Sequence, residues 1–221
     1  MYLDIGQSRH SKRARRWLAF LWRRTVVSDI VQGIIAGAVL AFCTVILVFI
    51  AEFHAIHTNV NGWITTLKCA EHRNGILLRA ACANDIAALN FPEEEVYWQT
   101  FVDGARHRLN GQHDYILHFP PGELPPNNAA WSVTMGDSRR FMVDNPIHRY
   151  SLGDRSGLAP NADGSIDIYI QNTAPAVQQS NWLPAPAGDF MLWLRVYQPE
   201  AAILNGTYRV PPVVEVKGGD K

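Results

Sequence analysis

The spacing of apolar and polar positions divides the chain into four regions. Residues 1–29 are polar and basic, and residues 30–51 are apolar almost throughout. Residues 52–95 repeat apolar side chains at helical spacing, whereas residues 96–217 alternate them in short runs separated by turn residues. This pattern predicts a basic N-terminus, a membrane-spanning helix, a helical connecting segment and a β-domain, in that order.

The apolar region is long enough to cross a membrane. No charged residue occurs from Ile34 to Ala51, and a helix needs about 20 apolar residues to span a hydrocarbon core. A cleaved signal peptide has a shorter apolar stretch, of about 7–15 residues, followed by a small-residue cleavage site. Here Glu52 follows the apolar run directly. The sequence therefore favours a retained transmembrane helix over residues 30–51, rather than a signal peptide or a buried helix.

The connecting segment reads as a hairpin of two short helices. Its first helix is expected around Trp63–Leu67 and its second around Ile76–Leu89, with Asn74-Gly75 as the break between them. Cys69 and Cys82 lie almost symmetrically about this break, so an antiparallel pair would bring them together. In an oxidising compartment they are expected to form a disulfide, and the alternative is two buried thiols.

The remaining chain has the signals of an all-β domain. The expected strands are rich in valine, isoleucine and aromatic residues and are bounded by proline, glycine and asparagine. They cover Val96–Val102, Asp114–Phe119, Ala130–Met135, Phe141–Val143, Tyr150–Leu152, Ile166–Ile170, Phe190–Tyr197 and Val213–Lys217. Eight short strands predict a jelly-roll-like antiparallel β-sandwich, with an immunoglobulin-like sandwich as the alternative.

Charge is unevenly distributed and predicts a topology. The chain has 20 basic and 20 acidic residues, which excludes a globally basic nucleic-acid-binding protein. The first 50 residues nevertheless carry seven basic and two acidic side chains, a net charge of +5, and the remainder carries −5. Because lysine and arginine accumulate on the cytoplasmic side of a span, we expect a single-pass inner-membrane protein with a cytoplasmic N-terminus and a periplasmic C-terminal domain.

Several stretches are similar to one bacterial family. They include Tyr115–Pro126 (YILHFPPGELPP), Val143–Asp154 (VDNPIHRYSLGD), Asn161–Gln171 (NADGSIDIYIQ), Asn181–Pro186 (NWLPAP) and Leu194–Pro199 (LRVYQP). Over residues 96–216 the chain resembles the family known as domain of unknown function 1214, which implies a jelly-roll β-sandwich. Many relatives carry a further domain of unknown function, 1254, upstream, where this chain has an anchor and a short helical segment. The resemblance implies no activity.

One group of side chains offers a candidate binding cleft. Arginines hold carboxylates or sulfate through paired hydrogen bonds, and tryptophan faces stack on sugar rings. The candidate residues are Trp131, Asn145, Arg149, Tyr150, Asp154, Trp182 and Arg195. The alternative is structural, with arginine–aspartate pairs bracing turns and the tryptophans in the core.

Motifs for catalysis and cofactors are absent from the sequence. It contains neither a G-x-S-x-G nor a phosphate-binding glycine motif, so we expect no cofactor and leave enzymatic activity open. Two sets of side chains would bind a metal only if they converged in space. They are His107, His113, His118 and His148, and Asp154, Asp163 and Asp167. We expect surface or hydrogen-bonded histidines and turn aspartates instead, and hence no metal.

The sequence thus predicts a membrane-anchored binding module. Its extracytoplasmic sandwich is expected to bind an envelope carbohydrate or a small anionic ligand, and no nucleic acid. One alternative is a hydrolase of envelope polymers on the same sandwich. Another is a structural partner in an envelope complex, dimerised through the small-residue series at Gly33 and Gly37.

Overall fold

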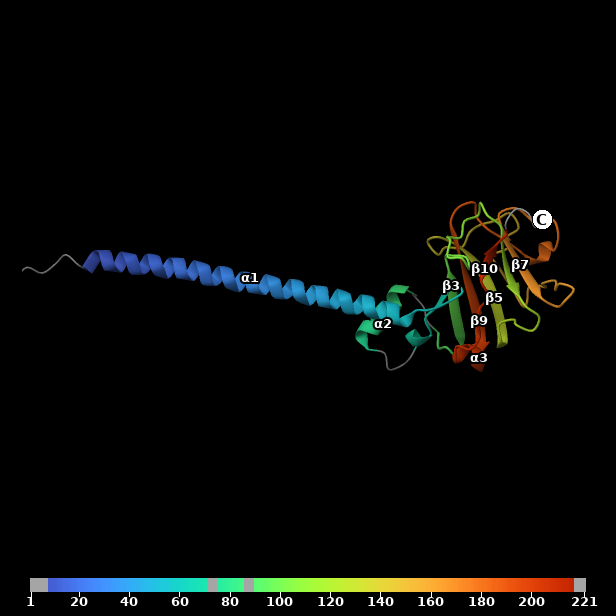
Figure 1. Cartoon of the computed structure of the whole chain (residues 1–221), viewed down its shortest axis with the longest axis horizontal. Helices are drawn as coiled ribbons and strands as arrows, with labels where there is room; N and C mark the ends of the chain where they lie inside the picture. Colours follow the sequence, from blue (N-terminus) through green and yellow to red (C-terminus); the bar gives the residue numbers. More distant parts are fainter. Residues whose placement is uncertain (1–7, 71–74, 86–89, 217–221) are drawn as a thin grey trace, which may run out of the picture. The chain divides into compact units, whose positions relative to one another are not determined.

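The computed structural model describes residues 8–70, 75–85 and 90–216. The chain divides into two compact units, residues 1–51 and 52–221. Helix α1 (Ser8–Ile56) makes up the first unit and ends in the second (Figure 1). Its segment Ser28–Glu52 is long and apolar enough to cross a membrane, a criterion that signal sequences also meet. A Cβ atom added at Gly33 or Gly37 would meet nothing within 4 Å.

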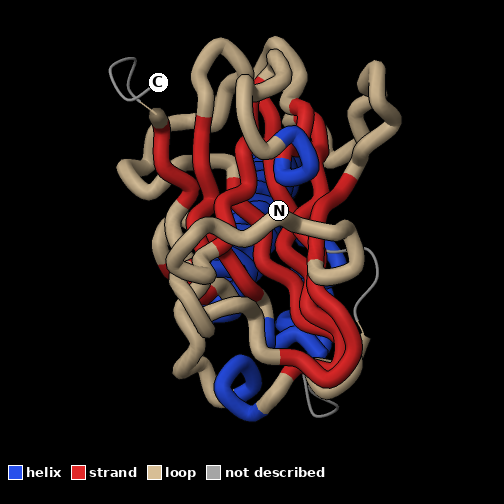
Figure 2. The backbone as a smooth tube through the Cα atoms, turned by 90° about the vertical axis from the view of Figure 1, so that its right-hand side faces the viewer, coloured by secondary structure: helices blue, strands red, loops and turns tan. Residues whose placement is uncertain are grey.

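The second unit is a sandwich of two β-sheets, whose strands are joined by long loops (Figure 2). The larger sheet has the order β1 (Thr58–Val60), β2 (Trp63–Thr65), β3 (Glu95–Thr100), β9 (Phe190–Pro199), β5 (Asn127–Asp137), β6 (Ser151–Gly153). The smaller sheet has the order β10 (Val213–Glu215), β4 (Tyr115–Phe119), β7 (Ile166–Gln171), β8 (Trp182–Pro184). The expected mainly β sandwich, preceded by one long apolar helix, is confirmed. Its pairs are antiparallel, apart from the parallel pair β7–β8.

Strand β9 is central to the larger sheet and organises the core. It pairs along its length with β3 on one side and with β5 on the other (Figure 1). Alternate residues of β9, from Phe190 to Val196, enter the core, where they meet side chains of β4 and β7 such as Leu117 and Ile168. The residues between them, Trp193 and Arg195 among others, lie on the outer face because successive strand residues point to opposite sides.

The strand predictions differ from the structure at Phe141–Val143, at β8, and at β1 and β2, which were not expected as strands. Phe141–Val143 was expected to be a strand, but it makes only an isolated bridge through Met142 to Gly136, and Phe141 and Met142 are exposed. Strand β8 was not expected, because Trp182–Pro184 offers three residues and a proline. It forms by pairing alongside β7, a contact that local sequence does not encode.

The prediction of a helix at Trp63–Leu67 is wrong. Trp63–Thr65 forms β2, whose Trp63 side chain is fully buried and whose indole donates a hydrogen bond to the carbonyl of Pro211 at 2.8 Å. Three apolar residues are too few to distinguish a period of 3.6 from a period of 2, so pairing with β3 decides the conformation. The second expected helix is present as α2 (Ile76–Asp85), and its expected end at residues 86–89 lies outside the described residues.

Short helical turns complete the fold. A 3-10 turn over Leu67–Ala70 (η1) precedes α2, another over Gln179–Asn181 (η2) leads into β8, and α3 (Ala201–Leu204) follows β9. The Sγ atoms of Cys69 in η1 and Cys82 in α2 are joined in a disulfide, with the two Cα atoms 5.6 Å apart. Closing a loop of this length stabilises a fold by about 3 kcal/mol in the chain-entropy model.

Counting free thiols tests the disulfide in the purified protein. The chain has three cysteines, and Cys43 is the free one. We therefore expect a thiol reagent to titrate one group per chain in the denatured, non-reduced protein, and three after reduction. Three thiols without reduction would contradict the pairing of Cys69 with Cys82.

Candidate functional site

The outer face of the larger sheet carries a row of aromatic and charged side chains. Register places Tyr97 of β3 beside Arg195 of β9, and Glu95 of β3 beside Tyr197 of β9. Trp193 is two residues before Arg195 and therefore shares its side of the strand. We call these five residues the outer-face cluster: Glu95, Tyr97, Trp193, Arg195 and Tyr197.

Arg195 lies between two aromatic rings. Its guanidinium carbon is 5.9 Å from the centre of the Tyr97 ring and 5.8 Å from that of Trp193, distances at which a cation is attracted to the ring face. Its Nε atom is buried and has no hydrogen-bond partner among the described residues. An unpaired buried N–H is unfavourable, so the rings offset part of that cost and hold the charge in place.

A buried carboxylate organises the tyrosines of the outer-face cluster. Glu95 is 6% exposed, and its Oε2 atom accepts hydrogen bonds from the Tyr97 hydroxyl and, at 2.6 Å, from Asn90 Nδ2. Burial raises the pKa of Tyr97, and the hydrogen bond to Glu95 raises it further. Burial also raises the pKa of Tyr197, and the charge of Glu95 adds to the effect. Both hydroxyls are therefore protonated near neutral pH and can donate hydrogen bonds.

A surface cavity opens beside this cluster. Its volume is about 710 Å³, and Tyr197, which is 36% exposed, belongs to both the cavity and the cluster. The other polar lining residues are Glu93, Glu94, Asn128, Arg155 and Gln198. One guanidinium nitrogen of Arg155 donates to the carbonyl of Ala129 at 3.0 Å, which fixes the side chain at the cavity wall. The cavity thus combines an aromatic ring with hydrogen-bond donors and acceptors.

Four of the sequence-predicted residues lie together and brace a loop. The side chain of Asn145 bonds both backbone groups of Arg149, each at 3.0 Å. Arg149 Nη1 donates to the carbonyls of Gln179 and Trp182, at 2.6 and 2.8 Å. The Tyr150 hydroxyl donates to Asp144 at 3.0 Å, a hydrogen bond that raises the pKa of Tyr150. The guanidinium group of Arg149 is therefore hydrogen-bonded to backbone carbonyl oxygens of the chain just before and in β8.

The other three predicted residues lie elsewhere. Trp131 is buried in the core against Phe119, with the ring centres 5.1 Å apart, and Asp154 is exposed after β6. Arg195 belongs to the outer-face cluster. Trp131 pairs with Val196, so it and Arg195 face opposite sides of the larger sheet. The seven residues therefore do not share one cleft.

Glu95, Tyr97, Trp193 and Tyr197 were not among the residues predicted from the sequence. A signal for them was present, because Trp193, Arg195 and Tyr197 recur at every second position of β9 and Glu95 and Tyr97 do the same in β3. That period of two places each set on one face. The register that brings the two sets together is not visible in either segment alone.

The candidate metal-binding histidines each pair with a carboxylate instead of converging as a group. The Nδ1 atoms of His118 and His148 lie 2.6 Å from Asp167 and 3.6 Å from Asp144, respectively. Asp163 accepts hydrogen bonds from Ser165, which lower its pKa, in a turn where Gly164 has a φ of +87°. His107 and His113 approach two carboxylates at a different place, which is described below.

Comparison with known proteins gives one family match for this chain. Residues 94–201 match the model of DUF1214, described as a protein of unknown function. The VPA0106 protein from Vibrio parahaemolyticus, whose crystal structure is known, has 29% sequence identity to this chain and a TM-score of 0.57. The match covers 66% of this chain and 36% of the VPA0106 chain. A putative uncharacterized protein from Burkholderia cenocepacia is 15% identical with a TM-score of 0.38, over 61% and 32% of the two chains.

The matched region coincides with most of the sandwich. The present chain spans about a third of the length of the two solved proteins. Among curated proteins, none matches. The family match runs from the residue before β3 to the start of α3, and it contains strands β3 to β9. Residues 94–201, which make up most of the β-sandwich, therefore match DUF1214, a family of proteins of unknown function.

Proposed function

We propose that this protein is a membrane-anchored module that binds an envelope carbohydrate at the cavity beside Tyr197. The observation that carries the proposal is that the outer-face cluster adjoins a cavity of about 710 Å³, which is lined by polar side chains. Aromatic rings pack against the apolar faces of sugars, and planar amide, carboxylate and guanidinium groups bond their hydroxyls. A ligand rich in hydroxyls can use all of these groups at once.

The charges around the cavity favour a carbohydrate over a small anion. Glu93 and Glu94 line the cavity and Glu95 adjoins it, whereas the basic side chains are Arg155 and Arg195. An anion would meet this acidic excess at close range, and like charges repel strongly where water is displaced. A neutral glycan meets no such barrier.

The anchor and its topology belong to the same proposal. The segment Ser28–Glu52 crosses the inner membrane, with the basic N-terminus in the cytoplasm and the sandwich in the periplasm. The disulfide Cys69–Cys82 supports this orientation, because disulfides persist in oxidising compartments and are rare in the cytosol. Dimerisation of the helix through Gly33 and Gly37 stays a prediction.

A binding screen of the full chain in detergent tests the function. The probes are neutral oligosaccharides of N-acetylglucosamine and of glucose, with inorganic phosphate as the anionic probe. We expect a neutral oligosaccharide to raise the melting temperature, and Tyr197→Ala to weaken its binding by about tenfold or more, since the ring supplies the stacking surface. Tyr150→Ala is the matched control on the loop that Asn145 braces, and we expect it to bind as the wild type does.

Each other outcome changes the conclusion. Binding of phosphate alone would replace the carbohydrate by a small anion. Loss of binding in Tyr150→Ala but not in Tyr197→Ala would move the site to the predicted loop, and no binding of any probe would contradict the proposal. Release of shorter sugars during the assay would favour the hydrolase, whose acid and base would then be sought at Glu93 and Glu94.

A further inference from the structure

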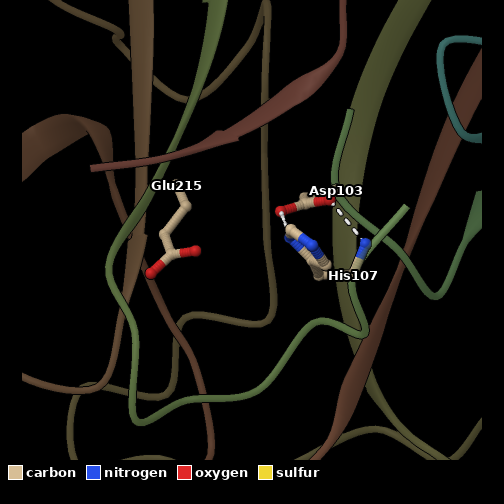
Figure 3. A group of neighbouring side chains, drawn as sticks. All are labelled: Asp103, His107 and Glu215. Atoms are coloured by element: carbon tan, nitrogen blue, oxygen red, sulfur yellow. Dashed lines mark hydrogen bonds and ion pairs between the residues drawn. The ribbon is translucent and has the colours of Figure 1, made fainter. Parts of the chain in front are cut away.

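A second polar cluster lies at the loop after β3 and shares no residue with the outer-face cluster. It consists of Asp103, His107 and Glu215, whose side chains approach one another in Figure 3. Each offers one ligand atom, and these three atoms all lie within 4.8 Å of one another. Within the described ranges this is the one group of three or more histidine, cysteine, aspartate or glutamate side chains that meets this geometry.

Backbone hydrogen bonds hold the first two residues in place. The N–H of Asp103 donates to the carbonyl of His107 at 2.8 Å, and the N–H of His107 donates to Asp103 Oδ1 at 2.8 Å. These two hydrogen bonds close the loop and fix the Asp103 carboxylate beside the backbone of His107. One carboxylate oxygen of Asp103, Oδ2, is left to face the imidazole of His107.

A further backbone contact brings Glu215, the third residue of the cluster, close to this loop. The N–H of Gly104 donates to the carbonyl of Val213 at 2.8 Å, and a Cβ at Gly104 would lie 2.7 Å from the ring of Pro212. The loop thus packs directly against the start of β10, the strand that carries Glu215. Residues separated by more than a hundred positions meet because the glycine permits this close approach.

The separation of His107 and Asp103 fits two ligands of one ion better than a hydrogen bond. Nδ1 of His107 lies 3.4 Å from Oδ2 of Asp103, which is long for a hydrogen bond. Two ligands of a tetrahedral zinc ion with bonds of about 2.1 Å are about 3.4 Å apart. His113 adds an outer contact, because its Nδ1 lies 2.8 Å from Glu215 Oε1 and orients that carboxylate.

Burial and access also suit a cation. Asp103 is 3% exposed, and a buried carboxylate is stabilised by a nearby positive charge. The same three residues line a cavity of about 450 Å³, through which an ion and its remaining water ligands can enter.

We propose that Asp103, His107 and Glu215 bind a divalent transition-metal ion of the zinc type. One imidazole with two carboxylates is a donor set for zinc and similar ions, whereas calcium and magnesium prefer oxygen ligands alone. Three protein ligands leave a coordination position open to the cavity. The site is independent of the carbohydrate-binding proposal, since the two share no residue.

The experiment measures zinc affinity of the full chain in detergent, without a histidine tag and after treatment with a chelator. A competition titration with a fluorescent zinc indicator is expected to give one saturable site. His107→Ala removes a ligand whose side chain is 74% exposed, so the fold is retained, and we expect at least about a tenfold loss of affinity. Asp103→Asn keeps the oxygen that accepts the His107 N–H, and it is expected to lose as much.

His148→Ala is the matched control. His148 also faces an aspartate four residues away, with Nδ1 3.6 Å from Asp144 Oδ1, but that aspartate is highly exposed. We expect this variant to keep the wild-type zinc affinity. The proposal is overturned if the wild type shows no saturable site, if His107→Ala binds zinc as the wild type does, or if His148→Ala loses as much affinity as His107→Ala.

Discussion

Gly111→Ala is expected to lower the free energy of unfolding by about 3 kcal/mol or more. A Cβ atom at this position would lie 1.7 Å from the carbonyl oxygen of Pro186 and 2.8 Å from its carbonyl carbon. Both neighbours are backbone atoms, which cannot rotate away as a side chain does. The two loops would have to separate and would lose the hydrogen bond from the N–H of Gly111 to the carbonyl of Gly188, now 3.0 Å long.

Gly188→Ala is the control for this effect, since Gly188 lies on the other side of the same hydrogen bond. A Cβ there would meet nothing within 4 Å, so we expect a change within about 0.5 kcal/mol. Urea unfolding of the full chain in detergent, followed by tryptophan fluorescence, measures both. Equal stability of the two variants would show that the loops do not approach each other as closely as described.

The second large effect is expected at Asn181, whose side chain is fully buried. Its Oδ1 atom accepts the N–H of Ala159, and its Nδ2 atom donates to the carbonyls of Ala159 and Asp167, each at 2.8 Å. Asn181→Ala removes the hydrogen bonds that its side chain makes to these three half-buried backbone groups. Since each costs about 1–3 kcal/mol when unsatisfied, we expect a loss of about 3–5 kcal/mol.

Asn172→Ala tests whether the effect depends on burial. Asn172 is exposed and makes a single hydrogen bond, to the carbonyl of Ala185 at 2.9 Å. Because only this one hydrogen bond is lost and the Asn172 side chain is exposed, a loss of about 1 kcal/mol or less is expected. The same urea titration distinguishes the variants, and losses of similar size at both positions would argue against the network around Asn181.

A period-two pattern is clearest in the segment that forms β7. Ile166, Ile168 and Ile170 alternate with Asp167 and Tyr169, and all three lie in the core. Strands β1, β2 and β8 were missed, because their three residues show no such pattern and form strands by pairing with neighbouring strands. The exposed segment at Phe141 shows the opposite error, since its apolar residues have no sheet to join.

The candidate site was harder to predict than the fold for a related reason. Arg195 was among the predicted residues, but its neighbour Tyr97 comes from β3, almost a hundred residues away. Glu95 was not predicted, and it is buried while Glu93 and Glu94 beside it are exposed. Cross-strand register decides both cases, and register is a property of the assembled sheet.

The central place of β9 also determines when the domain can assemble. Its partners β3 and β5 are made first, and they flank a position that stays vacant until residues 190–199 have been synthesised. Strand β4 likewise meets β10 only after almost a hundred further residues. The chain must lose the entropy of closing these long loops before the strand contacts can form, so the sandwich is expected to fold late and slowly. A nascent chain therefore exposes the unpaired edge of β3 while residues 101–189 are made, and that of β5 while residues 138–189 are made. This is the interval in which the chain would depend most on chaperones.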